Sequence, residues 1–237
     1  MLSRIVAATA AVLALGVPAI AMESDRASER PVVVELFTSQ GCSSCPPANA
    51  YLTDLVRSRK DVLPLGFHVT YWNRLGWVDP FSFEGATQRQ AAYGSRFGDG
   101  SYTPEIVVNG KVSFVGSHRA QGEAAIDAAK REAASAPVTV TRKGGSVSIN
   151  VGQGSGNARV ILVGYDAQHS TKVPRGENSG QTLVESNVVR SFQKVGDWAG
   201  QPVTLNVASP AGEEIAVLLE APDGSIVGAA RASDSAS

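Results

Sequence analysis

The sequence predicts an α/β domain with a helical insert, followed by an all-β sandwich-like domain. Strand-like and helical segments are mixed as far as residue 136, which is typical of a sheet layered with helices. The composition then changes at Pro137, and about seven short strand-like segments follow between turns rich in Gly, Pro and Asn. We expect the domains to span residues 31–136 and 137–231, with a disordered tail over residues 232–237.

The N-terminus has the pattern of a signal peptide. Arg4 supplies a positive start, residues 5–17 are apolar, and Ala19-Ile20-Ala21 fits a small-x-small cleavage site. The apolar run is short for a membrane span. We therefore expect residues 1–21 to be removed, residues 22–30 to form a flexible leader, and the mature protein to be periplasmic or secreted, where disulfides persist.

The first domain is predicted from its local patterns. The apolar run at residues 32–37 fits a strand buried on both faces. Pro46 and Pro47 suit the first turn of a helix, and apolar residues then recur at helical spacing. The remaining elements expected here are a strand at 61–71, a helix at 84–94, strands at 105–108 and 112–115 joined by an Asn109-Gly110 hairpin turn, and an Ala-rich helix at 119–136.

The second domain is predicted to be all β. Its strand-like segments are residues 138–151, 158–166, 182–195, 201–207 and 214–231. The overall composition, with 43% hydrophobic residues and a formal net charge of −1, is enough for a buried core and shows no bias toward nucleic acid or an anionic membrane. The sequence has no G-x-S-x-G, Walker or H-E-x-x-H motif.

The only two cysteines, Cys42 and Cys45, have three interpretations. As a structural disulfide they would close a very small loop and stabilise little. As a zinc site they lack the second pair of ligands, because the histidines are scattered: His68 fits a buried strand, while His118 and His169 fit solvated loops. A copper site using the two thiolates stays open as an alternative. A redox pair fits the strand-to-helix context best.

The redox interpretation assigns different roles to the two cysteines. Free N–H groups and the dipole at the start of a helix would stabilise a thiolate on Cys42, and Ser43 and Ser44 would add hydroxyl donors. Cys42 is then the nucleophile, and Cys45 is the buried thiol that resolves a mixed disulfide.

The segment VELFTSQGCSSCPP resembles the thioredoxin superfamily. Together with FHVTYWNRLGWVDPF, YTPEIVVNG and ENSGQTLVESNVVR, it resembles the exported bacterial thioredoxin-like proteins of domain-of-unknown-function family 1223. The resemblance implies a thioredoxin-like first domain in which Pro104 is cis and faces the cysteine pair, so that Thr103 can pair with an extended substrate peptide. An ordinary trans turn is the alternative for Thr103-Pro104.

Glu35 lies inside the first apolar strand, where an unpaired acid is costly to bury. Thioredoxins carry a buried acid near this place, so the resemblance implies that Glu35 accepts the proton of Cys45. The alternative is that Glu35 pairs with a lysine or arginine.

Residues 71–102 hold eight of the fifteen aromatic residues. They fit either a second small core or a groove beside the cysteines, lined by Trp72, Trp77, Phe81 and Tyr102. Taken together, the sequence predicts an exported thiol–disulfide oxidoreductase that acts on protein or small-molecule thiols and disulfides, with no organic cofactor or metal, no nucleic acid and no membrane span after signal removal. The alternatives are a non-catalytic binding protein and a copper-handling protein.

Overall fold

The structure is a computed structural model that describes residues 30–234. The expected signal peptide and residues 22–29 of the expected leader lie outside the described residues. Within residues 30–234, eleven strands form one mixed sheet in the order β4-β3-β1-β2-β8-β7-β10-β11-β5-β6-β9. The strands are β1 (Val32–Thr38), β2 (Val62–His68), β3 (Glu105–Val108), β4 (Val112–Val115), β5 (Val138–Lys143), β6 (Ser146–Val151), β7 (Ala158–Lys172), β8 (Thr182–Trp198), β9 (Val203–Ala208), β10 (Glu214–Glu220) and β11 (Ile226–Asp234). The helices are α1 (Pro46–Ser58), α2 (Glu84–Phe97) and α3 (Arg119–Lys130), with a short 3-10 turn η1 (Asn73–Leu75).

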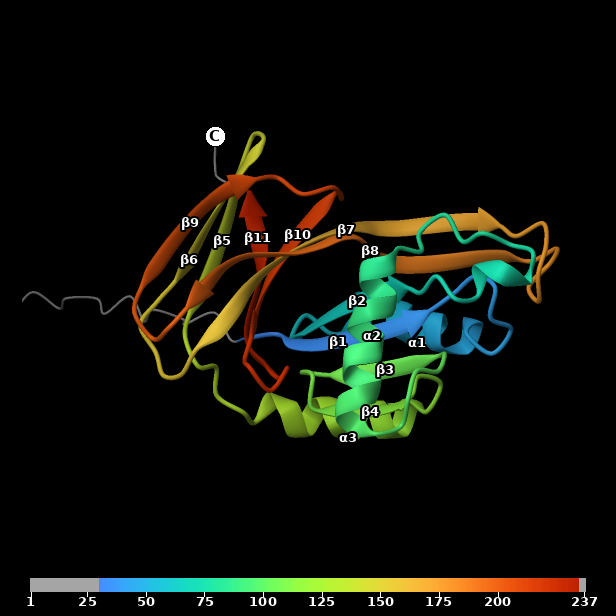
Figure 1. Cartoon of the computed structure of the whole chain (residues 1–237), viewed down its shortest axis with the longest axis horizontal. Coiled ribbons are helices and arrows are strands. Elements are labelled where there is room, and N and C mark those ends of the chain that lie inside the picture. Colours follow the sequence, from blue (N-terminus) through green and yellow to red (C-terminus); the bar gives the residue numbers. More distant parts are fainter. Residues whose placement is uncertain (1–29, 235–237) are drawn as a thin grey trace, which may run out of the picture.

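The expected fold class, an α/β thioredoxin-like domain followed by an all-β sandwich-like domain, is wrong. β2 pairs in parallel with β8 at Gly66 and Val188, and β8 pairs with β7 in a long antiparallel hairpin. Figure 1 shows β7 and β8 running from the C-terminal strands across to the part that carries the helices. β7 has 15 residues and β8 has 17, so both strands are longer than the segments that the sequence predicts. Because β8 also pairs with β2, the two parts form one mostly-β sheet.

Most individual elements agree with the sequence patterns. β3 and β4 have the predicted bounds, and their turn places Asn109 and Gly110 at φ 45° and 65°, the left-handed conformation of a tight hairpin. Several boundaries differ from the prediction: β2 ends at His68 instead of residue 71, and α2 continues to Phe97 instead of ending at residue 94. α3 ends at Lys130 instead of continuing toward Pro137, and β11 continues to Asp234, within the expected disordered tail.

The two faces of the helix-bearing part of the sheet have separate cores. Val34 and Leu36 of β1 pack with residues of α1 and α3, whereas Val33 and Phe37 pack with Ala86 and Tyr93 of α2. A further core lies among the C-terminal strands and contains Trp198. The two cores fix the position of β1, and the core on the α1 face also fixes α1. The cysteine pair lies in the turn that connects β1 to α1. Within residues 30–234, every helix is too short or too polar to span a bilayer.

Candidate functional site

Cys42 and Cys45 form a disulfide in the turn between β1 and α1, with Cα atoms 5.4 Å apart. The turn is closed by hydrogen bonds from the Cys42 amide to the Ser39 carbonyl and from the Cys45 amide to the Cys42 carbonyl, both 3.2 Å. Cys45 is the N-cap residue of α1. The exposed fraction of each cysteine is 0%, so the disulfide is covered on all sides.

Ser44 connects the disulfide to the segment that precedes β3. Its hydroxyl oxygen lies 3.3 Å from the sulfur of Cys42 and 3.5 Å from the carbonyl oxygen of Thr103, to which it donates. The Thr103-Pro104 peptide bond is cis. The structure therefore brings Thr103 and Pro104 to the cysteine turn, although they lie about sixty residues later in the chain.

The start of α1 differs from the expectation of free amide hydrogens beside Cys42. Pro46 and Pro47 occupy the first two helical positions and have no N–H, and the Ala48 amide is already bonded to the Cys45 carbonyl at 3.0 Å. The hydroxyl of Ser44 is instead the polar group beside the Cys42 sulfur.

The turn between β7 and β8 covers the cysteine turn. The Glu177 carboxylate accepts from the Ser43 amide at 2.9 Å and from the Ser43 hydroxyl at 2.7 Å, and these bonds lower the pKa of Glu177. The buried Asn178 amide donates to the carbonyls of Gln40 and Cys42, both at 2.9 Å. The sequence gives no local signal for these contacts, because more than 130 residues separate the partners.

The four predicted aromatic residues divide into two groups. Trp72 donates to the Thr103 hydroxyl at 2.8 Å and Trp77 donates to the Gln40 side-chain oxygen at 3.0 Å, so both contact segments beside the disulfide. The Phe81 ring contacts His68 and His169, with ring centroids 5.5 and 4.4 Å apart. The Tyr102 hydroxyl is bonded to Ser113 at 3.1 Å. The predicted groove lined by all four residues stays a prediction.

A buried cluster of polar side chains contacts the cysteine turn through Gln40. His68 at the end of β2 is bonded through Nδ1 to Asp79 at 2.7 Å, and Asp79 accepts from the Gln40 amide at 2.8 Å. The Gln40 side chain donates to Glu185 of β8 at 2.7 Å. Burial alone would lower the pKa of His68, but the carboxylates of Asp79 and Glu185 raise it to about 9. The cluster thus holds an imidazolium between two acids.

The histidines are placed differently from one another. His68 is buried and paired, as its strand pattern predicts. His169 lies in β7, bonded to Asp166 at 2.7 Å, rather than in a loop. Within residues 30–234, no group of three or more His, Cys, Asp and Glu side chains is arranged to hold a metal ion.

Glu35 is paired with an arginine. Its carboxylate accepts two hydrogen bonds from Arg89 of α2, one of them at 2.9 Å, and a third from the Tyr93 hydroxyl at 2.8 Å. Side chains alternate along β1, so Glu35 points with Val33 and Phe37 to the face that α2 covers, opposite the face that carries α1. This arrangement corresponds to the ion-pair alternative and gives no support to Glu35 as the proton acceptor of Cys45.

Sequence reasoning missed Glu105, which directly follows the cis proline. Its carboxylate is buried and accepts from Ser113 at 2.7 Å and from Gln90 at 2.8 Å. Burial raises the pKa of Glu105 to about 7, although both hydrogen bonds act in the opposite direction. The signal available in the sequence was an acid at the start of an apolar strand.

The chain is similar to one protein family and to two solved structures. A family profile described as "Protein of unknown function (DUF1223)" matches residues 33–220. The crystal structure of protein AGR_C_4864 from Agrobacterium tumefaciens is 34% identical, with a TM-score of 0.74 over 84% of this chain and 92% of that chain. The structure of HBP35 of Porphyromonas gingivalis is 16% identical, with a TM-score of 0.63 over 88% of this chain and 78% of that chain, which is a likeness of fold alone. No curated protein matches the chain significantly.

Proposed function

The chain belongs to the DUF1223 family of proteins of unknown function. We propose that it is a thiol–disulfide oxidoreductase that reacts through Cys42 and Cys45. One observation carries the proposal: the Cys42 sulfur lies beside the Ser44 hydroxyl, which in turn contacts the carbonyl of Thr103 in the segment before β3. A disulfide across two residues closes too small a loop to contribute much stability, so a structural role explains it poorly.

The exchange proceeds in two displacements. A substrate thiolate attacks the Cys42 sulfur, the Cys42–Cys45 bond breaks, and Cys45 leaves as a thiolate that takes up a proton. A second substrate thiolate then attacks the substrate sulfur of the mixed disulfide and releases Cys42. Two electrons pass from the substrate dithiol to the cysteine pair. The same steps in reverse reduce a substrate disulfide, with Cys42 as the attacking thiolate.

The hydroxyl of Ser44 supports the reactive sulfur in this proposal. The Ser44 hydroxyl has a single proton, which points to the Thr103 carbonyl in the disulfide form. When Cys42 is reduced, this proton turns to the sulfur 3.3 Å away and favours the thiolate over the thiol. Thr103 and Pro104 then form the wall against which substrate lies, and Trp72 and Trp77 extend that wall, because they bond to Thr103 and to Gln40. Reaching the buried sulfurs requires that the contact between Glu177 and Ser43 opens.

We also propose that the protein acts after export, in the periplasm or outside the cell. The signal-peptide pattern of residues 1–21 supports export, and an oxidising compartment suits an enzyme that exchanges disulfides. Fractionation of the producing cell tests this: the exported form lacks residues 1–21 by mass.

Single-cysteine variants test the proposed chemistry. We expect Cys45→Ala, with its remaining thiol reduced, to form a stable mixed disulfide with a disulfide substrate such as insulin, visible as an adduct mass. We expect Cys42→Ala to form the adduct at least about a hundredfold more slowly, because the Ser44 hydroxyl that favours a thiolate in this proposal lies beside the Cys42 sulfur. The wild-type protein should catalyse insulin reduction by dithiothreitol, and neither variant should.

Two results would contradict the proposal. Equal adduct rates in the two variants would show that Cys42 is not the selective nucleophile. A wild-type rate no faster than that of the chemically unfolded chain would show an ordinary cysteine pair and would favour the non-catalytic binding protein.

A further inference from the structure

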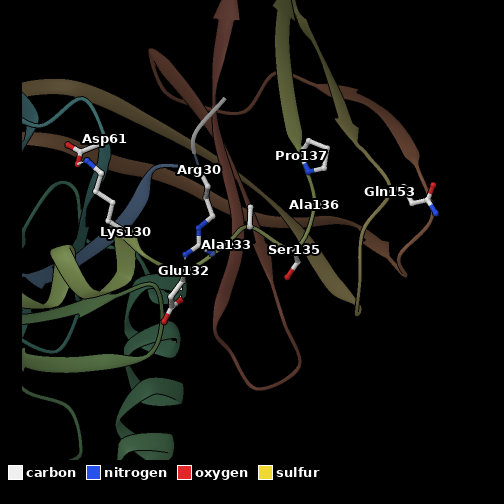
Figure 2. Close-up of a pocket in the computed structure, with 10 residues that line it drawn as sticks. Arg30, Asp61, Lys130, Glu132, Ala133, Ser135, Ala136, Pro137 and Gln153 are labelled. Atoms are coloured by element: carbon white, nitrogen blue, oxygen red, sulfur yellow. Dashed lines mark hydrogen bonds and ion pairs between the residues drawn. The ribbon is translucent and has the colours of Figure 1, made fainter. Parts of the chain in front are cut away.

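A cavity of about 500 Å³ lies at the junction between the end of α3 and the start of β5, and none of its lining residues belongs to the cysteine site. It is shown in Figure 2 and is lined by Arg30, Asp61, Lys130, Glu132, the segment 133–137 and Gln153. The early end of α3 at Lys130 creates one wall, because the chain that follows leaves the helix and bonds to β11 through the Ser135 amide and the Val227 carbonyl at 2.9 Å.

Arg30 brings an incompletely bonded guanidinium into this cavity. Its side chain is only 6% exposed, and Nη1 donates to the Ile226 carbonyl at 2.9 Å. Among the described residues, Nη2 has no hydrogen-bond acceptor, and its closest acid oxygen, Oε2 of Glu132, is 3.8 Å away. A buried charged donor without a partner is unfavourable. Burial accordingly lowers the pKa of Arg30.

The acids that line the cavity are already paired with other cations. Glu132 accepts from Lys111 at 2.8 Å. Asp61 accepts from Arg59 at 3.0 and 3.1 Å and from Lys130 at 3.0 Å. Figure 2 shows the Lys130 ammonium turned toward Asp61 and away from Arg30. Arg30 is therefore the cation that lacks an anionic partner at hydrogen-bond distance.

We propose that this cavity binds a small organic monocarboxylate with an apolar body. A carboxylate oxygen accepts from Nη2 of Arg30 and supplies the missing partner. The apolar part of the ligand packs against the side chains of Ala133, Ala134, Ala136 and Pro137. A monocarboxylate supplies an acceptor for the one guanidinium nitrogen that lacks it, whereas a dianion such as phosphate would need a second free cation, and Lys130 is committed to Asp61. The inference is independent of the proposed redox function.

The experiment titrates the full chain, isotopically labelled, with hexanoate and follows the backbone amide signals by NMR. We expect saturable shifts at Ala133, Ala134, Ser135 and Gln153, and no saturable shifts with hexanamide, which has the same apolar body without the charge. Absence of saturable shifts with hexanoate, equal binding of hexanamide, or tighter binding of inorganic phosphate than of hexanoate would each overturn the proposal.

Two variants test the role of Arg30. We expect Arg30→Gln to weaken hexanoate binding at least about tenfold, because a charge-assisted hydrogen bond is lost. Arg57→Gln removes the same charge from an exposed position on α1 outside the cavity and should bind like the wild type. If Arg30→Gln does not fold, Arg30→Lys replaces it, with weakened binding expected because an ammonium does not reproduce the guanidinium geometry. Unchanged binding in the folded variant would overturn the proposal.

Discussion

At the scale of single residues, Glu105 is a buried acid beside the cis proline and is not used by the proposed exchange reaction. Its carboxyl group accepts from two neutral donors, Ser113 and Gln90, and from no cation in the part of the chain that the structure describes. Since burial raises its pKa to about 7, the folded protein holds this proton more tightly than the unfolded chain does. The group therefore makes the free energy of unfolding depend on pH near neutrality.

We expect Glu105→Gln to remove this dependence. The folded pKa lies above the unfolded value, so the wild-type stability falls as the pH rises from about 4.5 to about 7, and it remains lowered at higher pH. Relative to Glu105→Gln, the wild type should lose roughly 1–3 kcal/mol between pH 5 and pH 8. Urea unfolding of both proteins at these two pH values measures the difference.

The matched control is Glu214→Gln, which changes an exposed acid at the start of β10. This variant should follow the wild-type pH profile. If Glu105→Gln also ran parallel to the wild type, the Glu105 carboxyl would not be the group that retains its proton in the folded state.

Residues of the site were predictable from the sequence where they belong to a local pattern. The spacing of Cys42 and Cys45 and the dipeptide Thr103-Pro104 identify the residues that meet, but the contact through Ser44 depends on two segments about sixty residues apart. His68 was recognisable as a core histidine, whereas its partner Asp79 lies in an irregular segment with no periodic signal. Long-range partners of this kind are set by the fold.

At the scale of elements, the sequence patterns predicted which strands and helices form better than they predicted where each one ends. The β3–β4 hairpin follows from Asn109-Gly110, whose backbone suits a tight turn. α3 ends early although alanines continue after it, since the Ser135 amide bonds to Val227 of β11 instead of continuing the helix. β7 and β8 extend through polar residues because they pair with each other over their length. In both cases a tertiary contact overrides local propensity.

The turn between β7 and β8, residues 173–181, contacts the cysteine turn through Glu177 and Asn178. We expect Glu177→Ala to speed reduction of the Cys42–Cys45 disulfide several-fold, because both bonds from Ser43 to Glu177 are lost and the cover opens more often. The measurement follows reduction by cysteamine, a cationic thiol, and by mercaptopropionate, an anionic one.

The two reductants distinguish opening of the β7–β8 turn from the electrostatic effect of removing the Glu177 charge. Loss of the Glu177 charge alone would slow cysteamine and speed mercaptopropionate, whereas a looser cover speeds both. Ser179→Ala is the matched control in the same turn, since the Ser179 hydroxyl donates within the turn, to the Pro174 carbonyl at 3.0 Å. Opposite responses to the two reductants would show that Glu177 acts through its charge and not as part of a cover.

At the scale of the whole molecule, the decisive feature is the continuity of the sheet. The composition change at Pro137 suggested two independent folds, but β8 pairs with β2 on one side and with β7 on the other, and β7 pairs in turn with β10. Pairing between β2 and β8 joins segments more than 120 residues apart, and no local pattern encodes it. The sequence therefore predicted the parts and their order, while the way they join depends on long-range strand pairing.

A buried ionic network crosses the same junction. Arg89 of α2 is bonded to Glu35 of β1 and, at 2.8 Å, to Glu220 of β10, and Glu220 is also bonded to Arg159 of β7. β1 and β10 are separated in the sheet by β2, β8 and β7. The side chain of Arg89 thus links α2 to strands from both parts, and its removal would leave the buried Glu35 carboxylate without its cation.

This geometry predicts that both parts unfold together. In a urea series analysed by pulsed hydrogen exchange and mass spectrometry, peptides covering β1 and β6 should show the same midpoint, because β8 pairs with both β2 and β7 and cannot leave the sheet without breaking both pairings. Arg89→Met should lower the free energy of unfolding by about 3–5 kcal/mol, the usual effect of breaking a buried ion pair. It should also shift the β1 and β6 midpoints equally.

The control is Gln88→Met, at an exposed position on the same helix, which should change the free energy of unfolding by less than about 0.5 kcal/mol. If Arg89→Met displaced the β1 midpoint and left that of β6 in place, the sheet would be continuous in structure but not in cooperativity, and the two parts would behave as separate folding units.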